Sequence, residues 1–242
     1  MSLSRALADR LAAFERGVTQ DQSSLYRTVL EDLGRSGIFD AAVTAGQRAP
    51  SFTLLDQHNE LVSLSSLLAH GPLVVTFYRG GWCPYCNLQL LAYQQVLPAI
   101  RELGAQLVAI SPQLIDYGER TAQAARLDFP VLSDVGNVVA ATYGLVFELP
   151  PSLRAAYENA GTPVQVNNGD GTWQLPAPGT FVVAQSGLVV LSYVDADYRK
   201  RLEPAEILGA LSDLRDDIQV GDLASESPRT REVAGIDNGR FE

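Results

Sequence analysis

The sequence predicts an α/β domain with a mixed central sheet, helices on both faces of that sheet, and a helical N-terminal extension. The first observation is the run at 73–77, which is apolar or β-branched throughout and leads through Gly80 and Gly81 into apolar residues spaced three and four apart. The second is the alternation of strand-like and helical segments over 106–143, which implies parallel strands. The third is the pair of apolar segments at 180–184 and 188–194, which flank a glycine turn and are typical of antiparallel strands.

The remaining elements divide the chain into an arm at 1–43, a main domain at 44–220 and a tail at 221–242. In the arm, apolar residues predict helix over 3–34, interrupted at Gly17 and Thr19, with a cap for the second helix at Ser23 or Ser24. In the main domain we expect strands at 52–54, 61–62, 106–111 and 130–132, helices at 63–69, 83–104, 117–127, 137–143, 153–158 and 204–213, and a hairpin or flap made by 162–166 and 172–175.

Composition excludes several classes of protein. The 242 residues carry a net charge of −10, whereas nucleic-acid binding needs a basic surface, so no nucleic-acid partner is expected. No apolar run is long enough to span a bilayer, so no membrane partner is expected either. The first sixteen residues include acids and lack a continuous apolar stretch, which is unlike a secretory signal. These features favour a cytoplasmic location.

Both cysteines, Cys83 and Cys86, stand where the predicted strand–turn–helix unit enters its helix. The first turn of a helix has unpaired N–H groups and a partial positive charge. A thiolate there is stabilised, so its pKa falls from about 8.5 towards about 3.5–7.5. Pro84 suits the first helical position, which needs no N–H. The spacing therefore favours a pair of thiols that cycles between dithiol and disulfide.

Two other interpretations of the cysteines stay open at this point. They are compatible with inert core thiols, or with part of a zinc site. A structural zinc site needs four ligands, however, and the histidines, His58 and His70, precede the motif without ligand spacing. We expect both histidines to lie in surface turns, and we expect neither a metal nor a cofactor.

Three segments resemble the alkyl hydroperoxide reductase/thiol-specific antioxidant (AhpC/TSA) family of peroxiredoxins. These are the lead-in strand at 46–54, the strand, loop and helix at 77–90, and the late hairpin beginning at Gly179-Thr180-Phe181. The resemblance spans about 46–215 and implies a thioredoxin-like fold. It also implies a thiolate, a hydroxyl three residues before it, and an arginine from the late hairpin that together polarise the peroxide O–O bond.

The chain departs from that pattern twice. The family register places Cys86 at the position of the attacking thiol and Cys83 at that of the hydroxyl, while Pro178 occupies the position of the late arginine. Arg79 is the candidate for a substitute positive charge. Trp82 and Pro178 resemble thioredoxins instead, in which a proline before the late strand has a cis peptide bond. In that register Cys83 is the exposed nucleophile and Cys86 the buried resolving thiol.

The resemblance thus predicts a peroxiredoxin-like antioxidant enzyme in which Cys86 attacks a hydroperoxide and Cys83 closes a disulfide that an external dithiol reduces. Arg79, Trp82, Pro178 and Thr180 are the expected substrate-binding or activating residues. One alternative is a disulfide reductase that acts on protein disulfides through Cys83, and another is a non-catalytic redox sensor. An active-site or dimer role is open for the charged run 199–201. The apolar arm favours a homodimer.

Overall fold

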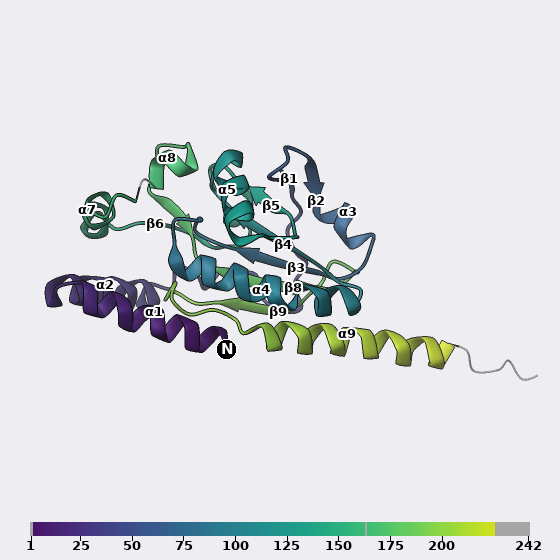
Figure 1. The fold of residues 1–242 in the computed structure, drawn as a ribbon. Coiled ribbons are helices and arrows are strands. Elements are labelled where there is room, and N and C mark those ends of the chain that lie inside the picture. Colours follow the sequence, from purple (N-terminus) through teal and green to yellow (C-terminus); the bar gives the residue numbers. More distant parts are fainter. Residues whose placement is uncertain (1, 163, 226–242) are drawn as a thin grey trace, which may run out of the picture.

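A seven-stranded mixed sheet forms the centre of the protein (Figure 1). This computed structural model describes residues 2–162 and 164–225. The strands are β1 (Thr53–Leu55), β2 (Leu61–Ser63), β3 (Leu73–Phe77), β4 (Gln106–Ser111), β5 (Val131–Ser133), β6 (Val146–Glu148), β7 (Gln174–Pro176), β8 (Gly179–Val183) and β9 (Val189–Val194). The helices are α1 (Leu3–Gly17), α2 (Gln20–Arg35), α3 (Leu64–Leu68), α4 (Pro84–Glu102), α5 (Ile115–Ala125), α6 (Val138–Thr142), α7 (Pro151–Asn159), α8 (Val164–Asn168) and α9 (Pro204–Ser225).

The sheet has the order β2-β1-β5-β4-β3-β8-β9, with β3 parallel to β4 and antiparallel to β8. All five residues of β3 are buried, as expected for a central strand whose two faces are both covered. Its side chains alternate between two cores. Val74 packs in the core beneath α1, α4, α5 and α9, whereas Val75 packs in the core beneath α3 and α6. The predicted mixed sheet with helices on both faces is confirmed.

The N-terminal arm consists of two helices that pack on the same chain. Thr19 caps α2 through a reciprocal capping box with Gln22, so the expected cap at Ser23 or Ser24 is wrong. Leu3 and Leu7 enter the core against α4, and Leu30 is also buried. The apolar stripe that suggested a dimer is therefore largely covered by the protein's own main domain.

Two expectations for the second half of the chain are wrong. Residues 162–166 and 172–175 do not form a hairpin, since Val164–Asn168 is helical and β7 pairs with β6 instead. Phe147 and Leu175 of these paired strands pack in a third core with α7 and α8. The apolar contacts in this core favour pairing of β7 with β6 over a local hairpin. Helix α9 continues to Ser225, past the expected end at 213, and the rest of the predicted tail lies outside the described residues. No helix in the described ranges is long and apolar enough to cross a membrane.

Candidate active site

The two glycines after β3 let the chain turn tightly into α4. Gly80 has a φ of 145°, and a Cβ there would lie 2.4 Å from Nε1 of Trp82. A Cβ on Gly81 would lie 2.2 Å from Oγ1 of Thr121. The turn is fixed by Gln113, whose Oε1 accepts a hydrogen bond of 2.7 Å from the Gly81 amide. Only glycine fits both positions, so the turn can place the next residues at the start of α4.

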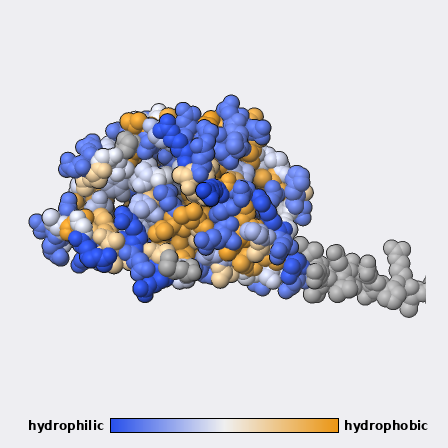
Figure 2. Space-filling model, in the orientation of Figure 1, coloured by the Kyte–Doolittle hydropathy of each residue, from blue (hydrophilic) through white to orange (hydrophobic). Residues whose placement is uncertain are grey.

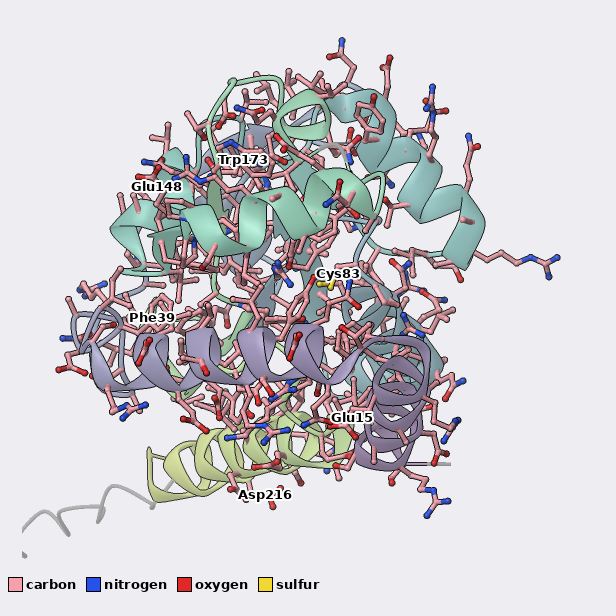
Figure 3. All side chains as sticks on the ribbon, turned by 90° about the vertical axis from the view of Figure 1, so that its left-hand side faces the viewer. Glu15, Phe39, Cys83, Glu148, Trp173 and Asp216 are labelled. Carbon is pink, nitrogen blue, oxygen red and sulfur yellow. The ribbon has the colours of Figure 1, made fainter. Side chains whose placement is uncertain are left out.

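Cys83 is the N-cap of α4 and Pro84 is its first residue, as the sequence predicts. Both cysteines are free thiols, with Cys83 1% exposed and Cys86 fully buried. Cys83 is thus only marginally the more exposed of the two, and neither thiol is open to solvent. The physical reason is tertiary, because Cys83 lies between α7 and the arm helix α2, which cover this end of α4 (Figure 3).

Arg201 reaches Cys86 from the segment between β9 and α9. Its Nη2 donates to the Cys86 sulfur at 3.5 Å, and its Nε donates to Oε1 of Gln89 at 2.8 Å. The side chain is buried, and its Nη1 donates to a backbone carbonyl. The guanidinium is therefore held by its other hydrogen bonds in a fixed position on the sulfur.

Sequence reasoning did not include Arg201 among the site residues. One signal was available in the charged run that contains it. That run, 199–201, follows the last strand, and an active-site role was left open for it; in the structure Arg199 pairs with Asp197 and Lys200 with Asp195, whereas Arg201 contacts the Cys86 sulfur.

Arg79 folds back over the cysteines, as expected for a substitute positive charge. Its Nη1 lies 3.9 Å from the Cys83 sulfur, and its Nη2 donates to the hydroxyl of Tyr157. The guanidinium carbon lies 4.0 Å from the ring centroid of Tyr198 and 5.0 Å from that of Trp82. These cation–π contacts hold a buried charge that has no carboxylate partner among the described residues.

Trp82 packs against Tyr157, with ring centroids 5.8 Å apart, and both rings line the same cavity as Cys83. Thr180 contacts Gln89, which holds Arg201, and has no hydrogen bond to either sulfur. Its hydroxyl bonds with Thr76 at 2.9 Å and accepts from Gln89 at 3.3 Å, and Gln89 in turn holds Arg201. Thr180 is thus positioned to orient the arginine rather than to contact sulfur.

The sequence left open whether the peptide bond before Pro178 is cis, and every peptide bond among the described residues is trans. Pro178 is buried directly before β8, which begins at Gly179. A proline before the first strand residue costs no ladder hydrogen bond, which accounts for its presence there.

The two thiols have opposite electrostatics. Burial raises the pKa of Cys86, but a hydrogen bond from the Cys83 thiol and the charges of Arg201 and Arg79 together lower it to about 5. Burial, and then the hydrogen bond that Cys83 donates to Cys86, raise the pKa of Cys83 well above its usual range. These opposite shifts favour a thiolate at Cys86 and a thiol at Cys83 at neutral pH.

Comparisons with known proteins show the family of the chain. The family model described as "AhpC/TSA family" matches residues 45–192, well over half of the chain. The chain belongs to the AhpC/TSA family. It is 30% identical to peroxiredoxin Q, chloroplastic, from Sedum lineare over 177 residues, which are 73% of this chain and 82% of that protein. It is 33% identical to peroxiredoxin Q, chloroplastic, from Triticum aestivum over 174 residues, which are 72% of this chain and 67% of that protein.

The fold gives the same assignment. The crystal structure of peroxidoxin BcpB from Mycobacterium tuberculosis matches with a TM-score of 0.55 and 25% identity, over 72% of this chain and 97% of that one. This AhpC/TSA protein is a peroxiredoxin related to peroxiredoxin Q, with a thioredoxin-like fold extended by α1 and α2. As a thiol peroxidase it acts on a hydroperoxide and depends on a thiol reductant.

Proposed function

We propose that Cys86 is the thiol that reduces the hydroperoxide and that Cys83 resolves it. One observation carries this assignment: Cys86 is the sulfur that Arg201 contacts at 3.5 Å and the one whose pKa falls to about 5. A thiolate is the nucleophilic form of cysteine, so Cys86 is ionised and ready to react at neutral pH. Cys83 is protonated and donates to it, as the family's hydroxyl would.

The reaction follows from these protonation states. The Cys86 thiolate attacks the terminal oxygen of ROOH, the O–O bond breaks, and the sulfur is oxidised to a sulfenic acid while RO⁻ leaves and takes up a proton as ROH. Arg201 and Arg79 stabilise the negative charge as it passes from sulfur to the leaving oxygen. The Cys83 sulfur then attacks the Cys86 sulfenic acid, a disulfide forms, and the hydroxyl leaves with the Cys83 proton as water.

This arrangement makes one residue serve two steps. Cys83 first donates a hydrogen bond to the thiolate and then supplies the resolving sulfur. The two cysteines are the N-cap and the third residue of α4, and the Cys86 amide donates to the Cys83 carbonyl at 3.0 Å, so both side chains start from the same turn of the helix. A dithiol cycle within one chain is therefore the cycle that this geometry favours.

The test is to identify the sulfur that is oxidised first. Cys83→Ser and Cys86→Ser are each mixed with one equivalent of hydrogen peroxide, or of an organic hydroperoxide, in the presence of a sulfenic-acid trap. We expect fast trapping in Cys83→Ser alone, and loss of two hydrogens by intact mass in the oxidised wild type. Trapping in Cys86→Ser alone would reverse the roles. Fast insulin reduction without peroxide reactivity would instead select the disulfide reductase, and neither activity would leave the redox sensor.

Assembly and location form a separate part of the proposal. We propose a homodimer that uses the face of α4 that carries Leu91, which is 41% exposed. Figure 2 shows hydrophobic residues gathered on the front of the molecule, where Figure 1 places α4. Light scattering at micromolar concentration tests this, and a monomer would contradict it.

We place the protein in the cytoplasm, where a reducing thiol pool would return the disulfide to the dithiol. The plant relatives are named as chloroplastic, so fractionation of the source cells is the corresponding test.

A further inference from the structure

A cavity of about 150 Å³ opens over Cys83 between the arm, α7 and the start of α4. Figure 3 looks onto this side of the molecule. Aromatic rings supply most of the wall, and they come from the arm as well as from the main domain: Phe14, Tyr26, Trp82, Tyr85, Tyr157 and Tyr198. Cys83 lines the cavity and Cys86 does not, so the cavity leads to one sulfur of the pair.

The charge of the cavity is positive. Arg10 and Arg79 both line it, and no lining residue is acidic. Each of these arginines has a buried Nε without a hydrogen-bond partner among the described residues. The hydroxyl of Tyr85 is likewise buried and has no hydrogen-bond partner there. Arg79 is only 1% exposed. Buried donors without partners are costly, so this wall is suited to a ligand that brings acceptors and negative charge.

Oxidation strengthens this preference. In the reduced protein the Cys86 thiolate offsets the charges of Arg79 and Arg201. When the disulfide forms, that negative charge disappears while both guanidiniums remain buried beside the sulfurs. The oxidised site therefore attracts an anion more strongly than the reduced site does.

The geometry also determines which sulfur a reductant would attack. Only the Cys83 sulfur faces the cavity, so attack there expels Cys86. Cys86 is the better leaving group, because Arg201 contacts it and its thiolate is the more stable of the two. Thiol–disulfide exchange is faster when the leaving thiol has the lower pKa.

We propose that this aromatic cavity is the entry site for the reductant, and that it admits a small thiol carrying a carboxylate. The inference rests on the proposed Cys83–Cys86 disulfide. A cavity of 150 Å³ has room for a group about the size of benzene, which suits one arm of a small molecule and not a loop of a partner protein. The carboxylate pairs with Arg10 and Arg79 while the sulfur meets Cys83.

The exchange balances in two steps. The incoming thiolate RS⁻ bonds to the Cys83 sulfur, the Cys83–Cys86 bond breaks, and Cys86 leaves as the thiolate. A second RS⁻ then attacks the mixed disulfide, giving RSSR and the Cys83 thiolate, which takes up a proton. Two electrons pass from two thiols to the protein disulfide.

The experiment compares reductants that differ in charge. The full chain is oxidised with peroxide, or with diamide if peroxide gives no disulfide, so that reduction is measured in either case and failure of the proposed peroxidase cycle is seen separately. Reduction by 3-mercaptopropionate, 2-mercaptoethanol and cysteamine is followed by quenching and intact mass, with each rate expressed per thiolate. We expect the anionic thiol to react about tenfold faster than the neutral one and the cationic thiol to be slowest, with a preference that shrinks as salt rises.

Matched variants locate the effect. Arg10→Ala should reduce the ratio of the anionic to the neutral rate about tenfold, whereas Arg10→Lys should retain most of it and Arg16→Ala, an exposed arginine on the same helix, should leave it unchanged. The trapped adduct should map to Cys83. Equal rates for the three thiols, an adduct on Cys86, or a protein dithiol such as thioredoxin outpacing 3-mercaptopropionate at equal concentration would each overturn the proposal.

Discussion

Arg201→Gln should raise the pKa of Cys86 and slow its oxidation below neutral pH. The guanidinium Nη2 lies 3.5 Å from the Cys86 sulfur. With an effective dielectric constant near 20, a unit charge at that distance interacts by about 5 kcal/mol, which corresponds to about 3.5 pKa units. Arg79 remains in the variant, the serine hydroxyl of the Cys83→Ser background used for the titration takes the place of the Cys83 thiol as a donor, and solvent relaxation reduces the difference. We therefore expect a rise of about 2 units, from about 5 to about 7.

The pKa is measured from thiolate absorbance at 240 nm in a Cys83→Ser background, which leaves one thiol to titrate. At pH 6 the thiolate fraction should fall from about nine-tenths to about one-tenth, so the second-order rate with peroxide should fall about ninefold. At pH 9 both proteins are ionised. Any loss that remains there measures how far Arg201 also stabilises charge on the leaving oxygen.

Arg199→Gln is the matched control, since Arg199 is a neighbour in the chain whose guanidinium pairs with Asp197. Its Cys86 pKa should match that of the parent. Circular dichroism checks that both variants fold, and Arg201→Lys should recover part of the low pKa by restoring the charge. A pKa that stays near 5 in Arg201→Gln would refute the role assigned to this arginine.

Three further predictions concern stability and the active-site turn. Because the pKa of Cys86 is lowered in the folded state, the reduced protein should gain stability over Cys86→Ser as pH rises from about 5 to 8.5. Because the pKa of Cys83 is raised in the folded state, stability should fall again above about 8.5. Urea denaturation measures both effects, and a free energy of unfolding that changes with pH in the same way in the two proteins would contradict this. Leu7→Ala should lower the free energy of unfolding by about 2–5 kcal/mol, and a loss below about 1 kcal/mol would mean that the arm does not share the core. Gly80→Ala should displace Trp82 and slow peroxide oxidation of Cys86 at least tenfold, whereas a normal rate with unchanged tryptophan fluorescence would argue against the turn geometry.

The order of the elements could be predicted because each depends on local periodicity. The strand at Leu73–Phe77, its glycine turn and the helix from Pro84 follow from apolar spacing and from the properties of glycine and proline. The same reasoning failed for the segment from 162 to 175. Its polar turn suggested a hairpin, but the strand Gln174–Pro176 pairs with Val146–Glu148, a partner almost thirty residues earlier in the chain. Long-range pairing of this kind is decided by tertiary packing and leaves little local signal.

The site shows the same division. The sequence by itself determined that two thiols stand at the start of a helix behind a strand and a glycine turn, with Arg79 as a candidate neighbour in that turn. Only the tertiary structure decided that Arg201, 115 residues beyond Cys86, contacts its sulfur, and that the arm and α7 bury Cys83. The thiolate at Cys86 depends on those contacts. Its pKa is set by charges a few ångströms away in space, whatever their distance along the chain.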